Sequence, residues 1–206
     1  MPAKLLIATT NPDKVREILP LMQGLPIDIV TLADVATVPE PEEVGDSFWE
    51  NARLKALAYA HATGLVAVAE DSGLEIAALD GEPGVRSARF LGADTPYPVR
   101  FEEIFRRLGS APRDARFVTA LAVARDADIL FETETSIDGV IAPAAAGDQG
   151  FGYDPIFWYP PFCSTTAQLR AQDKAMVSHR ARAFRDLRRW LDTKAALELF
   201  RNGTID

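Results

Sequence analysis

The chain contains very little of several residue types, and each shortage excludes a class of protein. Cys163 is its one cysteine, so an intrachain disulfide framework is excluded and a reducing compartment suits the protein. No segment reaches the roughly 20 apolar residues that are needed to cross a bilayer. The first residues, MPAKLL, lack the apolar core of a signal peptide. We therefore expect a cytoplasmic protein with no membrane partner.

Positive charge is also scarce. The 22 Lys and Arg residues are outnumbered by 30 Asp and Glu residues, which gives a net charge of −8. Proteins that follow a nucleic-acid backbone need an excess of cations, so we expect no nucleic-acid partner. A small anionic ligand is compatible with this balance, because it needs only a local cluster of Lys and Arg.

What is present is a mixture of strand and helix patterns. Continuous apolar runs at 5–8 and 65–69 are typical of buried strands, and the apolar spacing over 15–22 is helical. Two strands joined by the DAD turn at 126–128 predict antiparallel pairing, and a helix is expected from about 178 to 200. The sequence therefore predicts a mixed α/β sheet, with residues 1–206 as a single domain.

A lysine stands where the first helix is expected to begin. The turn TTNPDK runs from Thr9 to Lys14, and either Asn11 or Asp13 can cap the helix. Lys14 then lies near the positive end of the helix dipole, which disfavours a cation by up to about 1 kcal/mol. A bound phosphate would interact favourably with both the dipole and the ammonium group. The turn lacks the GxxxxGK[ST] pattern, so it is not a Walker A loop.

Two consecutive acids, Glu70 and Asp71, end an apolar strand in VAVAEDSGLEI. Buried carboxylates are costly unless a cation or a proton neutralises them, and their oxygens suit Mg²⁺ or Mn²⁺. Side chains alternate across a strand, so the two should diverge unless a sharp turn at Gly73 re-aims one of them. The alternative interpretation is an exposed acidic turn with Ser72 as a local cap.

Aromatic rings occur in GFGYDPIF, from Gly150 to Phe157. Phe151 and Tyr153, beside flexible glycines, suit stacking on a planar base, although such rings more often pack into a core.

Cations occur at two further unusual places. His179 and Arg180 follow Ser178, the expected N-cap of the last helix, and so lie at the unfavourable end of its dipole. Lys55 interrupts an apolar helical stripe, where snorkelling to solvent is the usual outcome, and Asn51 shares its side of the helix. Phosphate-binding cations, paired carboxylates and a stacking loop together predict a nucleoside triphosphate as ligand.

Five stretches resemble, in order, the blocks of the inosine triphosphate pyrophosphatase family: LLIATTNPDKVREI, VAEDSGLEI, GEPGVRSARFLG, GFGYDPIF and DKAMVSHRARAF. The resemblance covers nearly the whole chain. It implies an elongated mixed α/β fold with two lobes flanking a substrate cleft, a homodimer, and a requirement for Mg²⁺, with Mn²⁺ as the alternative. It also implies hydrolysis of ITP, dITP and XTP to the monophosphate and pyrophosphate.

The resemblance also implies a role for individual residues. Asp71 would be the catalytic base and a metal ligand, Glu42 the other metal ligand, and Ser72 a substrate contact. The remaining substrate-binding residues would hold the triphosphate (Thr9, Thr10, Asn11, Pro12, Asp13 and Lys14), line the base pocket (Phe151, Gly152, Tyr153 and Asp154) or close it (Lys174, His179 and Arg180).

Two positions depart from the family pattern, which usually has Gly where Thr10 stands and commonly has Asp where Glu70 stands. Two alternative functions stay open: a pyrophosphatase for modified pyrimidine or guanosine nucleotides, and a nucleotide-binding sensor without turnover. Glu42 and Asp71 favour an enzyme, because a sensor needs no general base.

Overall fold

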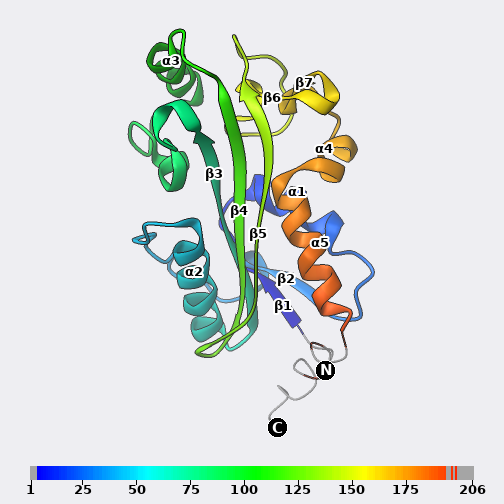
Figure 1. Ribbon diagram of the computed structural model, residues 1–206. Coiled ribbons are helices and arrows are strands. Elements are labelled where there is room, and N and C mark those ends of the chain that lie inside the picture. Colours follow the sequence, from blue (N-terminus) through cyan, green and yellow to red (C-terminus); the bar gives the residue numbers. More distant parts are fainter. Residues whose placement is uncertain (1–3, 194–195, 197, 199–206) are drawn as a thin grey trace. The chain divides into compact units, whose positions relative to one another are not determined.

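The computed structural model describes residues 4–193, 196 and 198 (Figure 1). Its seven-stranded sheet has the order β2-β1-β3-β4-β5-β6-β7. Strand β1 pairs in parallel with β2 and β3, whereas β6 pairs antiparallel with β5 and β7, so the predicted mixed sheet is confirmed. The strands are β1 (Lys4–Ile7), β2 (Asp28–Thr31), β3 (Val66–Ile76), β4 (Asp114–Arg125), β5 (Asp128–Ile141), β6 (Phe157–Tyr159) and β7 (Ser164–Thr165).

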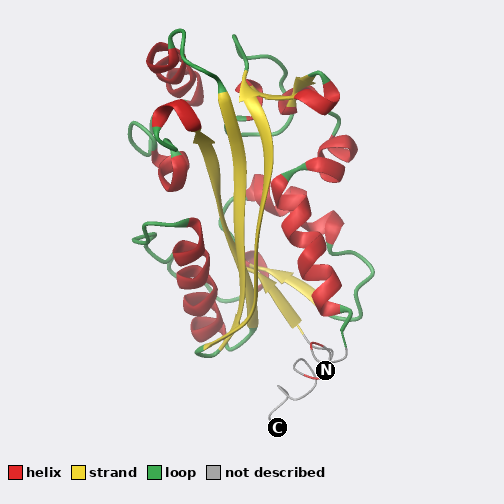
Figure 2. Ribbon diagram, in the orientation of Figure 1, coloured by secondary structure: helices red, strands yellow, loops and turns green. Residues whose placement is uncertain are grey.

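Helices occupy the stretches between several of the strands (Figure 2). The α-helices are α1 (Pro12–Leu21), α2 (Phe48–Thr63), α3 (Tyr97–Leu108), α4 (Ala171–Val177) and α5 (His179–Leu191). Within the described residues, no helix is both long and apolar enough to span a bilayer.

The predicted boundaries of α2 are confirmed, and its capping differs in one detail. Ser47 caps the helix by accepting a hydrogen bond from the Glu50 N–H, and Gly64 ends it with φ at +67°. In a complete capping box the Glu50 carboxylate would return to the Ser47 N–H. It instead accepts from the Asp46 N–H, at 2.7 Å.

One local prediction is wrong. The sequence predicts that the acids end a short strand and that the chain turns at Gly73, but β3 runs unbroken through Glu70, Asp71 and Gly73 to Ile76. Nearly every residue of β3 is buried, so neighbouring elements enclose both faces and hold the backbone extended through the glycine. The last helix begins at His179, directly after the predicted cap Ser178, and its predicted extension over 194–200 lies almost wholly outside the described residues.

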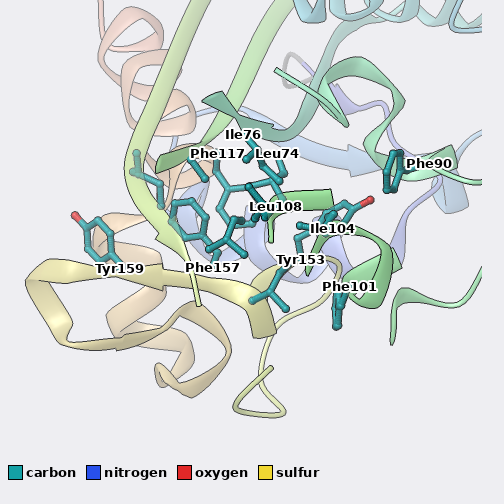
Figure 3. Close-up of a cluster of buried hydrophobic side chains, with 14 residues drawn as sticks. Leu74, Ile76, Phe90, Phe101, Ile104, Leu108, Phe117, Tyr153, Phe157 and Tyr159 are labelled. Atoms are coloured by element: carbon teal, nitrogen blue, oxygen red, sulfur yellow. The ribbon is translucent and has the colours of Figure 1, made fainter. Parts of the chain in front are cut away.

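The chain forms two compact units, each with a core of its own. The first unit comprises residues 1–71, 119–135 and 180–206, and the second comprises residues 72–118 and 136–179. In the second unit, aliphatic residues of β3 and α3 pack with aromatic residues such as Phe117, Tyr153 and Phe157 (Figure 3). In the first unit, Leu5 of β1 and Val68 of β3 pack with residues of α1 and α5.

Strand alternation in the first unit decides where the two acids point. Val66 and Val68 belong to the core formed with α1 and α5, and Glu70 continues the same face at spacing two. Asp71 follows the opposite face, where Lys55 and Asn51 of α2 donate to it. Figure 1 shows α2 across the strands from α5. The prediction that the two carboxylates diverge is therefore confirmed.

Candidate active site

On the α1 and α5 side of β3, Glu70 is the centre of a buried ion cluster. Its Oε1 lies 3.1 Å from Lys14 Nζ, in the first turn of α1, and 2.9 Å from Arg180 Nε, in the first turn of α5. Arg180 also donates through Nη1 to Glu17 Oε2 at 2.7 Å. The side chains of Glu70 and Arg180 are 2% and 3% exposed, so water screens these contacts little.

The ionisation of this cluster follows from burial and from neighbouring charge. Burial lowers the pKa of Lys14, and Glu70 opposes that shift. Burial alone would raise the pKa of Glu70, but Arg180 and Lys14 hold that pKa well below its usual range. Glu70 is therefore a carboxylate at neutral pH, and Lys14 depends on it for a compensating charge.

On the α2 side, Asp71 is held by two residues of that helix. Its Oδ1 accepts from Lys55 Nζ at 2.9 Å, and its Oδ2 accepts from the Asn51 side-chain amide at 3.2 Å. Lys55 also donates to Glu43 Oε1 at 2.6 Å, so one ammonium bridges two carboxylates. Lys55 is buried and does not snorkel to solvent. Its place in the apolar stripe was the sequence signal for this role.

The two bridged carboxylates differ from the predicted metal pair. Glu42 is exposed, whereas its neighbour Glu43 is half-buried and reaches Lys55 beside Asp71. Burial raises the pKa of Asp71, an effect that Lys55 partly offsets. Burial lowers the pKa of Lys55, but Asp71 and Glu43 outweigh that effect, and the pKa of Lys55 is raised. The carboxylate that the geometry pairs with Asp71 is Glu43, a choice that two adjacent Glu residues in a loop could not reveal.

The turn predicted to bind phosphate, from Thr9 to Lys14, is closed by its own side chains. Asn11 caps α1 by accepting from the Asp13 and Lys14 N–H groups, at 2.9 and 3.3 Å. Pro12 has no N–H, and the next two N–H groups of the helix already donate to Asn11. An anion at this turn would therefore contact side chains before backbone N–H groups. Thr10, which replaces the usual Gly, donates to Glu40 Oε1 at 2.9 Å.

In the second unit, Asp154 organises the expected base loop. Its Oδ2 accepts from the Phe151 N–H at 2.8 Å and from Lys174 Nζ, and its Oδ1 accepts from Thr166 Oγ1 at 2.7 Å. The Lys174 ammonium lies 5.1 Å from the Phe151 ring centroid, a cation–π distance. Gly150, with φ at +73°, leaves room for the contact between Asp154 and Lys174.

The aromatic residues of this unit divide into core and surface. Tyr153 is buried, its hydroxyl donates to the Ser87 carbonyl at 2.9 Å, and its ring meets Tyr97 edge to face. Phe151 is only half-buried, which makes it the better candidate for stacking on a base. His179 is buried and stacks on Phe117, with ring centroids 4.8 Å apart.

The predicted site residues thus fall into two groups. Thr9–Lys14, Asp71 and Arg180 belong to the first unit, and the other expected substrate-binding residues, the half-buried Ser72 among them, belong to the second. The described ion cluster adds residues that the predicted site had left out: Glu17, Glu43, Asn51, Lys55 and Glu70.

The chain is similar to known proteins along nearly its whole length. The model of the Ham1 family matches residues 5–190. A dITP/XTP pyrophosphatase of Syntrophobacter fumaroxidans is 42% identical over 98% of this chain and 90% of its own. One of Thermus thermophilus is 44% identical over 97% and 93%. Among solved structures, the HAM1 protein of Coxiella burnetii is 36% identical, with a TM-score of 0.85 over 92% of this chain and 98% of its own. The Ham1 protein of Staphylococcus aureus is 33% identical, with a TM-score of 0.83 over the same shares.

Proposed function

The chain belongs to the Ham1 family, and we propose from that premise that it hydrolyses non-standard purine nucleoside triphosphates to the monophosphate and pyrophosphate. The substrates are ITP, dITP and XTP. The observation that carries the proposal is the buried cluster in the first unit, where Lys14, Lys55 and Arg180 accompany the carboxylates of Glu70 and Asp71. Lysine and arginine side chains bind polyphosphate, and a buried carboxylate can supply a base.

The turn from Thr9 to Lys14 is the proposed triphosphate site. Because Asn11 already satisfies the first amides of α1, the main attraction comes from the Lys14 ammonium and from the threonine hydroxyls. Thr10 must exchange its contact with Glu40 to bind a phosphate oxygen. Lys14 and Lys55 then stabilise the negative charge that develops during the reaction.

Asp71 is the proposed general base. Burial raises its pKa, which makes it a stronger proton acceptor than an exposed aspartate, while Lys55 and Asn51 fix its two oxygens. It orients or deprotonates a water molecule for in-line attack on the α-phosphorus. Pyrophosphate then leaves directly, which matches the products named above.

Glu43 and Asp71 fit a divalent cation. Both are carboxylates, the ligand class that Mg²⁺ prefers, and they already converge on one positive charge, the Lys55 ammonium. Mg²⁺ is the proposed ion, with Mn²⁺ as the alternative, held by Glu43 and Asp71 rather than by Glu42. When bound, such an ion neutralises phosphate charge. Mg²⁺ usually keeps several waters and is held by one or two carboxylates together with substrate phosphate oxygens, so two protein carboxylates are enough for it.

The loop around Asp154 is the proposed base pocket. Phe151 offers the ring for stacking, while Lys174 and His179 offer donors to a purine with a keto oxygen at C6. Adenine has an amino group at C6, which is itself a donor. Lys174 and His179 would then have no acceptor on the base, and their donor groups would be left unpaired. We expect ITP and XTP to be preferred over ATP for this reason.

Pyrophosphate release tests the proposal. The chain with Mg²⁺ is given ITP, dITP, XTP, ATP, GTP and a modified pyrimidine triphosphate, and the monophosphate and pyrophosphate are both quantified. Faster turnover of ITP, dITP and XTP than of ATP supports the proposal. Tight binding of ITP without any product would instead indicate a sensor, and a preference for a modified pyrimidine would indicate the related pyrophosphatase.

Two further properties are proposed. A homodimer rests on the family resemblance alone, and a cytoplasmic location rests on the scarcity of cysteine. Light scattering after gel filtration would distinguish a dimer from the 22.5 kDa monomer.

A further inference from the structure

We propose that Glu70 is a positioning residue of the triphosphate site, which holds the Lys14 ammonium in the place where it meets a phosphate. This inference rests on the function proposed above, because it assigns a role within the same site. It assigns a role to a buried carboxylate that lies on the opposite face of β3 from Asp71, the proposed general base.

The first argument is the sharing of one oxygen. Glu70 Oε1 contacts both Lys14 Nζ, at 3.1 Å, and Arg180 Nε, at 2.9 Å, from two different helices. Glu70 Oε2 is buried and has no hydrogen-bond donor in the described part of the chain, so the carboxylate acts through Oε1 alone. Lys14 is therefore aligned with a point that Arg180 also fixes.

The second argument is the rigidity of the other partner. Arg180 is held on its far side by Glu17 Oε2, at 2.7 Å, and its side chain is 3% exposed. A guanidinium fork held at two carboxylates has little freedom, whereas a lysine has four rotatable bonds. Arg180 fixes Glu70, and Glu70 in turn selects one position for the flexible Lys14 side chain.

The third argument is charge balance. Lys14 lies in the first turn of α1, is largely buried, and has the cations Arg180 and Lys55 nearby, all of which disfavour its ammonium. Glu70 is its contacting anion, and Asp71 contributes more weakly. Without the Glu70 charge, Arg180 and Lys55 would repel the Lys14 ammonium from the proposed triphosphate turn.

The same geometry argues against a metal-binding role for Glu70. Two cations, Lys14 and Arg180, already balance the charge of Glu70, and Asp71 lies on the opposite face of β3. A positioning role therefore predicts an unchanged Mg²⁺ requirement when the charge of Glu70 is removed.

A double-mutant cycle with Glu70→Gln and Lys14→Ala tests the proposal. The probe is inosine 5′-(α,β-methylene)triphosphate, measured by calorimetry and set beside kcat and KM for ITP. Glu70→Gln should weaken probe binding by roughly 10- to 100-fold in the native background but less than about 3-fold beside Lys14→Ala, because neighbours that act together are not additive. KM should rise more than kcat falls, and Glu70→Asp should recover part of the loss.

Glu132→Gln is the matched control, since it also removes a carboxylate paired with an arginine, Arg53, outside the site. It should leave binding unchanged. Losses from Glu70→Gln and Lys14→Ala that multiply, or a Glu70→Gln protein that binds like the native one, would overturn the proposal. If Glu70→Gln does not fold, the cycle with Glu70→Asp decides by the same criterion. If the native chain binds the probe but releases no pyrophosphate from any triphosphate, the proposed function fails while the binding cycle still judges Glu70.

Discussion

Glu70 and Asp71 are consecutive residues, yet their carboxylates lie on opposite faces of β3. Glu70 pairs with Lys14, and Asp71 pairs with Lys55. One strand therefore presents an anion to each of two lysines, of which Lys55 is buried and Lys14 is partly buried. The two contacts are separable by mutation, because each lysine comes from a different helix. The predictions below use that separation.

Asp71→Asn should abolish turnover while the protein stays folded. Loss of the carboxylate removes the proposed base and a metal ligand, so kcat for ITP should fall by about 10²-fold or more. Stopped assays of pyrophosphate release, with circular dichroism to confirm folding, provide the measurement. Glu75→Gln is the control, since Glu75 lies on the same strand but pairs with Arg116. Native kcat in a folded Asp71→Asn protein would refute the assignment.

The Mg²⁺ requirement should distinguish Glu43 from Glu42. Glu43→Gln should raise the Mg²⁺ concentration for half-maximal activity by about 10-fold or more, by analogy with the loss of an orienting group at a metal site. Glu42→Gln should titrate like the native chain, because the Glu42 side chain is exposed. The opposite ranking of the two variants would restore the assignment made from sequence.

Binding of triphosphate should weaken at high pH. Burial lowers the pKa of Lys14. Glu70 and Asp71 oppose this shift, whereas Arg180 and Lys55 add to it, and the pKa stays below that of an ordinary lysine. Only the protonated amine attracts phosphate, so affinity for the methylene analogue should fall as pH rises through a value below that of an ordinary lysine. Lys14→Arg keeps its charge and should move this fall to higher pH. Identical pH profiles for the two proteins would exclude Lys14 as the titrating group.

The base loop should depend on the absence of a side chain at Gly150. A Cβ there would collide with Asp154 Oδ2 and lie 2.9 Å from Lys174 Nζ, so Gly150→Ala should raise KM for ITP and lower the melting temperature. Gly81→Ala is the matched control, because Gly81 also has positive φ but has nothing within 4 Å of the added Cβ. Backbone strain alone costs on the order of 1 kcal/mol. If the two variants lose equal stability, the loop contact is not what Gly150 protects.

Local signals in the sequence predicted much of the fold. The cap Ser47 and the stop at Gly64 each leave a signature within a few residues, and both are confirmed. Of the two candidate caps Asn11 and Asp13, the structure uses Asn11. The DAD turn is also confirmed, although its last residue, Asp128, already belongs to β5. The turn at Gly73 was wrong because burial of both faces, which is a tertiary effect, outweighed the freedom of one glycine.

The site was harder to predict because its contacts join distant parts of the chain. Alternation predicted that Glu70 and Asp71 diverge, and the interrupted apolar stripe marked Lys55 as unusual. Sequence could not show that Arg180 would reach Glu70, 110 positions away, nor choose between Glu42 and Glu43 in an irregular loop. The lysine at the start of α1 was explained by a phosphate alone. The structure adds a resident anion, Glu70, so we expect Lys14→Ala to destabilise the ligand-free protein.

The unbroken course of β3 also limits how this gene can change. Inserting or deleting one codon between Val66 and Glu70 would turn each later side chain of the strand to the other face, since side chains alternate with a period of two. Glu70 would then lie on the α2 face, and neither Lys14 nor Lys55 would contact its native carboxylate. Single substitutions here would be graded in their effect, whereas a one-residue length change would remove both ion pairs together. Length variation in natural or engineered variants should therefore be confined to the loops, with β3 kept at constant length up to Asp71.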